Sequence, residues 1–291
     1  MKTKLRITLV FIIALGWLGT ADGQQKPSAS PVQTPLGDSF NPAWSPDGRQ
    51  IIFEREVGGA YHLFVVGADG SGLRQLSRDP GQNSDGAWTK NGATIVFVSQ
   101  RDGHLQVYTM KADGSEARNV SNSETADYMP AISPDGQRIA YSSRPVGKRE
   151  QEIWVMNVDG TGKKLLAAGG TCYNPAWSPD GKQIAFTSNR TGKGEIYVVP
   201  AIGGEPSQVT RDLGAGSPDW SPDGRRFLFS ASSRLCVINT DGTGLIRLTS
   251  NQDGFAKWSP DGRRIVFCSK REGVWKIFVM NADGTGEQPL G

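Results

Sequence analysis

The chain has 291 residues, 37 of them glycine and 17 of them proline, and a formal net charge of +3. A charge this close to neutral gives no electrostatic footprint for nucleic acid or an anionic membrane surface. Regularly spaced apolar and aromatic residues exclude a disordered chain, and the glycine and proline content indicates many tight turns.

Residues 1–23 have the composition of a secretory signal peptide. Three basic residues precede an apolar core over residues 7–18, and residues 21–23 offer small side chains for cleavage. The apolar run is short for a membrane span. We therefore predict a periplasmic or secreted protein with no stable membrane insertion after cleavage; an uncleaved anchor is the alternative. Removal of three basic residues and Asp22 would take the net charge from +3 to +1.

Residues 24–37 are predicted to be a linker because they are rich in Gln, Pro and Ser. The end of this linker, residues 32–37, resembles residues 287–291 at the other end of the chain. Either segment is suited to be the outer strand of the last repeat unit, and only one is needed. The sequence weakly favours the C-terminal segment for this position. A ring-closing strand supplied by the linker is the alternative.

A strand–turn–strand unit recurs six times after the linker. In its clearest copy, residues 174–186, Ser178-Pro179-Asp180-Gly181 has the residues of a type I turn. A period of 38 to 45 residues separates the turn glycines, which are Gly48, Gly92, Gly136, Gly181, Gly224 and Gly262. Such a period indicates a repeat architecture.

Each copy continues with a third strand and an Asp-Gly or Gly-Gly turn, which favours the positive φ angles that join antiparallel strands. A fourth short strand ends near Leu76, Val120, Leu166, Val209, Leu248 and Leu290. Four antiparallel strands repeated radially are a β-propeller blade. We therefore predict an all-β fold with almost no helix, a six-bladed β-propeller of four-stranded antiparallel blades over residues 38–291.

The repeat resembles that of the TolB-type propeller family. The resemblance rests on Trp-Ser-Pro-Asp-Gly, the Ile/Val-rich strand after it and Asn-x-Asp-Gly-Thr-Gly after the third strand, with variations in single copies. It implies a TolB-like propeller without the separate N-terminal α/β domain of TolB. Similar propellers occur in oligogalacturonate lyases, which use several metal-binding histidines, whereas this chain has only His62 and His104.

One position of the repeat is tryptophan in five copies: Trp44, Trp88, Trp177, Trp220 and Trp258. These rings would form either an aromatic ligand site or a wedge between blades, and repetition on an inner strand favours the wedge. An arginine recurs after the second strand, and Arg101, Arg190 and Arg271 hold the same position. A ring of arginines would bind carboxylates in bidentate fashion; the alternative, which we favour, is a contact that stabilises each blade.

Strand direction alternates within a blade, so the tight turns after the first and third strands share one face, the turn face. The longer loops after the second and fourth strands share the other, the variable-loop face. Variable loops on a rigid scaffold are where binding usually occurs. We predict a binding surface around the channel mouth on the variable-loop face, formed by Phe40, Arg101, His104, Asp127, Tyr128, Tyr173, Asn174, Arg190 and Arg271. Aromatic residues that merely fill the channel are the alternative.

The sequence shows no nucleophile elbow, no P-loop and no histidine pair at helical spacing. Single aspartates in the turns do not make a calcium loop. We therefore expect no catalytic residue, cofactor or metal, no nucleic-acid partner, and a non-enzymatic scaffold for a protein or peptide partner, such as an envelope protein. The alternative is a carbohydrate-active hydrolase or lyase that binds a glycan at the channel mouth with Asp127 and His104.

Overall fold

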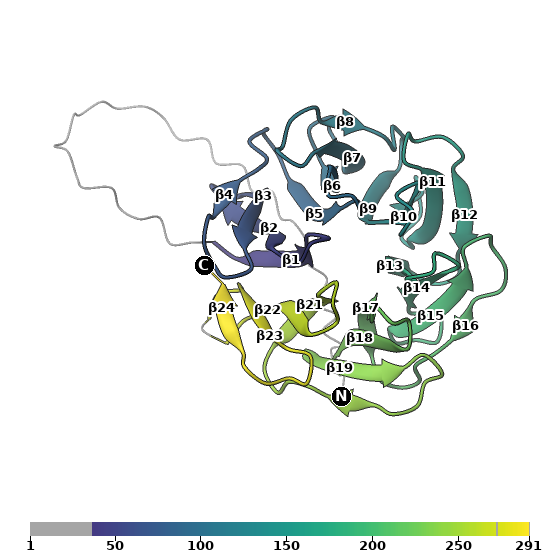
Figure 1. Cartoon of the computed structure of the whole chain (residues 1–291). Helices are drawn as coiled ribbons and strands as arrows, with labels where there is room; N and C mark the ends of the chain where they lie inside the picture. The colour runs from purple at the N-terminus through teal and green to yellow at the C-terminus, as the bar shows by residue number, and fades with distance from the viewer. Residues whose placement is uncertain (1–36, 272, 291) are drawn as a thin grey trace, which may run out of the picture. The chain divides into compact units, whose positions relative to one another are not determined.

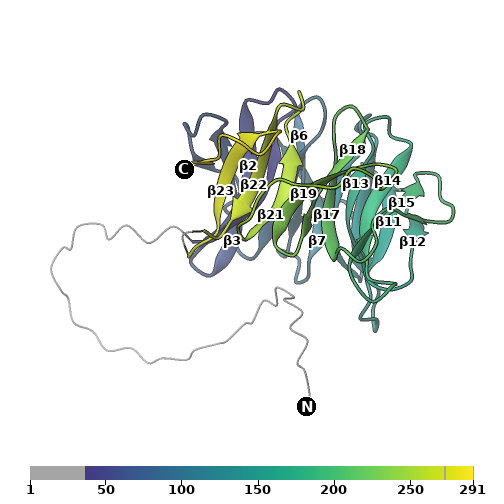
Figure 2. The same ribbon diagram turned by 90° about the horizontal axis from the view of Figure 1, so that it is seen from below.

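The structure, a computed structural model, describes residues 37–271 and 273–290, and the signal-peptide and linker predictions for residues 1–36 lie outside this part. The described residues form 24 strands and no helix, and therefore no helix that could cross a membrane. The strands build six four-stranded antiparallel sheets, set radially around a central channel (Figure 1). Seen from the side, the blades stand next to one another as one layer (Figure 2). The predicted all-β, six-bladed propeller is confirmed.

Each blade runs outward from the channel in sequence order. The inner strands are β1 (Ser39–Trp44), β5 (Asn83–Trp88), β9 (Ala126–Ile132), β13 (Cys172–Trp177), β17 (Ala215–Trp220) and β21 (Asp253–Trp258). The second strands are β2 (Gln50–Val57), β6 (Thr94–Ser99), β10 (Arg138–Arg144), β14 (Gln183–Ser188), β18 (Arg226–Ala231) and β22 (Arg264–Ser269). The third strands are β3 (Ala60–Gly67), β7 (Gln106–Lys111), β11 (Glu152–Asn157), β15 (Glu195–Pro200), β19 (Arg234–Asn239) and β23 (Lys276–Asn281). The outer strands are β4 (Arg74–Gln75), β8 (Arg118–Asn119), β12 (Lys164–Ala167), β16 (Ser207–Gln208), β20 (Ile246–Arg247) and β24 (Gln288–Leu290).

The turn between the first and second strands is fixed by its own side chains. Between β13 and β14, Ser178 Oγ donates to Asp180 Oδ1 at 2.6 Å, and the same oxygen accepts the Lys182 N–H at 3.1 Å. Gly181 adopts φ of 70°, where a side chain would be strained. The hydrogen bond from Ser178 lowers the pKa of Asp180, so the carboxylate stays ionised and the turn keeps its acceptor.

The repeated tryptophans lie between neighbouring blades. The indole Nε1 of Trp177 donates to the main-chain oxygen of Ala131 at 3.0 Å, and that of Trp220 to Ala176 at 3.1 Å, in each case on the preceding blade. Both side chains are buried. The Arg138 guanidinium lies 4.6 Å above the Trp177 ring. The predicted wedge between blades is therefore what the structure shows.

The last blade is built from contiguous chain, because β24 is the outer strand beside β23. Of the two segments suited to this position, the C-terminal one occupies it. Contacts between the first and last blades close the ring: the Ser39 N–H donates to the Trp275 oxygen at 2.9 Å, and Trp44 Nε1 donates to the Lys257 oxygen at 3.3 Å. Leu290 is buried in the cluster that these two blades share.

Candidate functional site

The central channel holds a cavity of about 630 Å³. Its lining runs from the middle of the inner strands into the turns that follow them. Prolines of four of these turns form part of its rim: Pro134, Pro179, Pro222 and Pro260. Among the residues that the structure describes, none from the variable loops lines it. The cavity therefore belongs to the turn-face half of the channel, whereas the sequence led us to expect a site at the opposite mouth.

A β-bulge in every inner strand brings one side chain to the cavity. In β1 the register with β2 shifts between Phe40 and Ala43, and the other five blades shift at the equivalent place. The bulge residues have φ angles between 48° and 54°, and all six line the cavity: Asn41, Asp85, Met129, Asn174, Ser217 and Phe255. In four blades the next residue is proline, which cannot donate to the strand ladder and suits a bulge.

On one side of the channel the bulge residues form a carboxyl cluster. Asn41 Nδ2 donates to Asp85 Oδ1 at 2.9 Å and to Glu54 Oε1 at 3.1 Å, and the Asp85 N–H donates to Glu54 Oε2 at 3.0 Å. Burial and the nearby Asp85 carboxylate raise the pKa of Glu54, and burial also raises the pKa of Asp85. Because two like charges this close do not both ionise readily, the pair retains a proton near neutral pH.

The opposite side of the channel carries a neutral polar pair. Asn174 Nδ2 donates to Ser217 Oγ at 2.7 Å, and the Ser217 N–H donates to Thr187 Oγ1 at 3.0 Å. Asn174 belongs to β13 and Ser217 to β17, so the pair joins two neighbouring blades, as the Asn41–Asp85 pair does. Each pair therefore presents fixed hydrogen-bonding atoms to the cavity.

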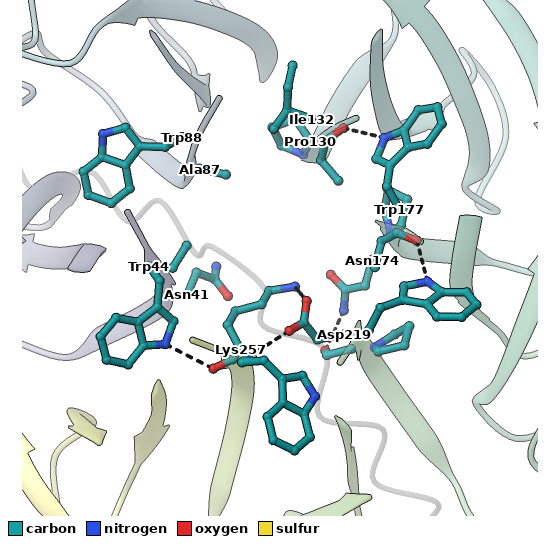
Figure 3. A pocket seen from close by; sticks show the side chains of 18 of the residues that line it. Asn41, Trp44, Ala87, Trp88, Pro130, Ile132, Asn174, Trp177, Asp219 and Lys257 are labelled. Carbon is teal, nitrogen blue, oxygen red and sulfur yellow. Dashed lines mark hydrogen bonds and ion pairs between the residues drawn. The ribbon is translucent and has the colours of Figure 1, made fainter. Parts of the chain in front are cut away.

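The residue immediately before the repeated tryptophan forms the next part of the cavity wall, toward the turns, and it is the same in most blades. Four blades have alanine there: Ala43, Ala87, Ala131 and Ala176. The remaining two have Asp219 and Lys257, whose Oδ1 and Nζ lie 3.3 Å apart inside the opening (Figure 3). Asp219 Oδ2 also accepts the Trp258 N–H at 2.9 Å. One ion pair thus stands in an otherwise apolar wall.

The predicted arginines make the same contact in three blades. Nε of Arg101, Arg190 and Arg271 donates to the hydroxyl of the serine two residues earlier, at 2.9–3.1 Å. Each guanidinium also lies 4.4–4.9 Å from the centre of an aromatic ring on the third strand. These are contacts within the blade, as in the alternative favoured from the sequence, and a ligand-binding role for these arginines stays a prediction.

Asp127 and His104 both contact the loop between β8 and β9, residues 120–125. Asp127 is 1% exposed, and its carboxylate accepts hydrogen bonds from the hydroxyls of Ser123, Thr125 and Ser143 at 2.7–2.9 Å. His104 Nε2 lies 2.8 Å from the Ser123 main-chain oxygen. The Asp127 carboxylate is engaged by the loop before β9 and by Ser143 of β10, so the structure gives the catalytic alternative no free acid at this position.

The three predicted aromatics stand one residue before the bulge and do not line the cavity. Phe40 packs among other rings, with centroid distances of 5.3 Å to Trp275 and 5.9 Å to Tyr61. Tyr128 and Tyr173 come from the neighbouring strands β9 and β13, and both are half-buried. Burial raises the pKa of both tyrosines. Their binding role also stays a prediction.

Sequence reasoning missed Glu54, Asp85, Asp219 and Lys257. For Glu54, Asp219 and Lys257 a signal was present in the repeat itself. At the position of Glu54 the other copies have uncharged residues: Val98, Ser142, Thr187, Ser230 and Cys268. Asp219 and Lys257 stand where the other copies have alanine. When one copy has a charged residue where the other copies have small or apolar residues, the fold does not require that charge. Among the residues that the structure describes, no three His, Cys, Asp or Glu side chains gather as ligands for a metal ion.

A six-bladed ring around an open cavity, with Trp-Ser-Pro-Asp-Gly in four of its six repeats, places this chain in the β-propeller class. The model of the TolB beta propeller domain matches residues 23–171 and 118–232, and the chain belongs to this family. No curated protein matches.

Solved structures with the same fold include TolB proteins and an enzyme. A protein described as TolB from Agrobacterium tumefaciens is 24% identical, with a TM-score of 0.68 over 76% of this chain and 84% of that one. TolB from Acinetobacter baumannii is 22% identical, with a TM-score of 0.66 over 87% of this chain and 63% of that one. The oligogalacturonate lyase of Vibrio parahaemolyticus is 14% identical, with a TM-score of 0.56 over 86% of this chain and 91% of that one.

Proposed function

We propose that this protein is an exported TolB-like propeller scaffold that docks a protein or peptide partner on its variable-loop face. The observation that carries the proposal is the position of Tyr128 and Tyr173. They stand half-buried on neighbouring inner strands at the variable-loop end of the channel. Tyrosine is enriched among the residues that dominate binding energy at protein interfaces, because it adds a large apolar area and a polar hydroxyl.

Exposed apolar side chains on the same face support the proposal. Val57, Val146 and Val274 lie at or within loops between second and third strands, and they are 47%, 73% and 40% exposed. Scattered single apolar residues are ordinary on a protein surface. These three lie on the first, third and sixth blades, on the face that also carries the two tyrosines.

The carboxyl groups that do meet in the structure do not favour a hydrolase. Two catalytic carboxyl groups of a glycosidase are separated by the substrate bond, or by that bond and a water. Between Glu54 and Asp85 the Asn41 amide donates to both, and Glu54 is only 7% exposed. The Asn41 amide therefore lies between the two carboxyl groups, where a glycosidase would hold the bond that it cleaves.

Site-specific photo-crosslinking tests the docking face. A photoreactive amino acid is placed at Tyr173 or, as a matched control, at Ile202, which is 80% exposed in the turn between β15 and β16. Each purified chain over residues 24–291 is irradiated in envelope extract, and the products are identified by mass spectrometry. We expect one dominant protein product from position 173, which disappears in the Tyr128→Ala background, and no such product from position 202. Equal products from both positions, or none from position 173, would contradict the proposal.

A further inference from the structure

The six bulge residues have a definite chemical order around the channel. Polar pairs on the first and second blades and on the fourth and fifth blades are separated by single apolar residues. In chain order the series is Asn41, Asp85, Met129, Asn174, Ser217 and Phe255. Blades three positions apart face each other in a six-bladed ring, so one polar pair faces the other and Met129 faces Phe255. Figure 3 shows Asn41 and Asn174 on opposite sides of the opening.

Backbone conformation accounts for only some of these side chains. At φ angles near 50°, glycine and asparagine are the residues that the chain tolerates best. Asn41 and Asn174 fit that preference. Met129 and Phe255 do not, although their φ angles are 51° and 50°. Both are only half-buried and both line the cavity, and the Phe255 ring also packs edge-on against Phe40, with ring centroids 6.3 Å apart.

The polar pairs leave hydrogen-bonding capacity for a ligand. Asn41 and Asn174 use their Nδ2 groups within the pairs. None of the residues that the structure describes donates to the amide oxygen of either asparagine. The Ser217 hydroxyl accepts from Asn174 and keeps its own hydrogen to donate. Acceptors thus face each other across the cavity, with a donor beside one of them.

We propose that this cavity is a binding site for a single sugar ring of pyranose size. A pyranose has two faces of C–H groups and hydroxyls around its edge, and each hydroxyl both donates and accepts. One face would pack on the Phe255 ring and the other on the Met129 side chain, while edge hydroxyls meet the two polar pairs. The cavity volume of about 630 Å³ lies within the range of small-ligand sites.

This site is separate from the docking surface proposed above. None of Phe40, Tyr128 and Tyr173 lines the cavity, which lies in the turn-face half of the channel. The Asp219–Lys257 ion pair stands one level nearer the turns and would contact a substituent of the bound ring. Tyr128→Ala, which changes a residue outside the cavity, is therefore expected to weaken partner binding and not sugar binding.

Titration of the purified chain with methyl α-D-glucopyranoside, methyl β-D-galactopyranoside and N-acetyl-D-glucosamine tests the proposal. Saturation-transfer NMR and calorimetry measure binding, and cyclohexanol serves as a ring of similar size that lacks the edge hydroxyls. We expect saturable binding of at least one sugar with Kd on the order of 1 mM, with the strongest saturation transfer to ring C–H groups. Absence of saturable binding for all three sugars, or equal competition by cyclohexanol, would overturn the proposal.

Variants locate the bound sugar within the channel. Asn174→Gly keeps a residue that tolerates positive φ and removes the amide, so we expect affinity to fall about three- to tenfold. Phe255→Leu removes the ring and should weaken binding by about tenfold. Asn122→Gly, at an exposed asparagine that also has a positive φ angle and lies outside the cavity, is the matched control and should bind as the parent does. Thermal unfolding confirms that each variant is folded, and unchanged affinity in both cavity variants would place the sugar elsewhere and refute the assignment.

Discussion

Replacement of Trp177 and of Trp258 by phenylalanine should have different effects on stability, although both residues hold the same position of the repeat. Both side chains are buried, 8% and 6% exposed. The Trp177 Nε1–H donates to the Ala131 main-chain oxygen of the preceding blade. The Trp258 Nε1 is buried without a hydrogen-bond partner among the described residues. The two substitutions therefore remove similar apolar volume but different polar contacts.

The expected difference follows from the unequal cost of made and unmade hydrogen bonds. Trp177→Phe leaves the Ala131 carbonyl without its indole partner, which costs about 1–3 kcal/mol beyond the packing loss. Trp258→Phe removes a donor that already lacked an acceptor, so it loses packing alone. The free energy of unfolding should fall further for Trp177→Phe, by about 1–3 kcal/mol. In a domain of this size that corresponds to about 2–4 °C in Tm for each kcal/mol.

Urea unfolding monitored by circular dichroism measures both variants against the parent chain. A common m-value shows that the midpoints can be compared directly. Trp177→Ala provides the upper limit, since deletion of the ring from the interface should cost about 3–5 kcal/mol. Equal losses for the two phenylalanine variants, or a larger loss at Trp258, would refute the argument that the indole–carbonyl bond joins the blades.

Three further predictions concern charge, pH and ring closure. Arg271→Met should destabilise the fold more than Arg190→Met in urea unfolding, by up to about 3–5 kcal/mol. Arg271 pairs with the fully buried Asp253 carboxylate and with Glu287, whereas Arg190 bonds a main-chain oxygen. Equal losses would contradict this. Burial gives Glu54 a raised pKa in the folded protein, so its contribution to stability is present at low pH and lost as pH rises from about 4.5 to about 8. Urea midpoints of the parent chain should therefore fall over that range more steeply than those of Glu54→Gln, and parallel profiles would exclude the linkage. Deletion of residues 287–291 should lower Tm because it removes β24, whereas a chain that starts at residue 37 should melt as the parent does; the reverse result would assign ring closure to the N-terminal segment.

Repetition made the fold predictable from sequence. A turn motif that occurs six times predicts the same local structure in six places. An error in the interpretation of one copy is therefore corrected by the other five. The same logic assigned the tryptophans to the blade interfaces, since one residue type on one inner-strand position implies one environment. The copy with Lys90 and Asn91 in place of the turn Pro and Asp still forms the turn, because Thr89 Oγ1 donates to Asn91 Oδ1 at 2.7 Å.

The cavity was not predictable by the same reasoning, because its geometry depends on a backbone irregularity. In a regular inner strand, the alternation of side chains between the two faces would decide where Asn41 and Asn174 point. At the bulge both residues instead adopt positive φ angles and line the channel. The prolines at the fourth residue of β1 and β13 were a sign of this interruption. The Glu54–Asp85 contact also depends on the bulge, since Asp85 reaches Glu54 through its own N–H at a bulge position.

The Asp219–Lys257 pair shows how a repeat separates positions that maintain the fold from positions that are free to act. Alanine at the same place in four blades demonstrates that a small apolar side chain is sufficient for the inner wall. The ion pair is partly exposed, with Lys257 at 38%, and such a pair adds only about 0–1 kcal/mol. Stability therefore gives little reason for two charged residues in the channel. Because Asp219 and Lys257 lie beside the six bulge residues, we expect them to contact the ligand of the cavity. A polar substituent that points toward the turn face would lie against this ion pair.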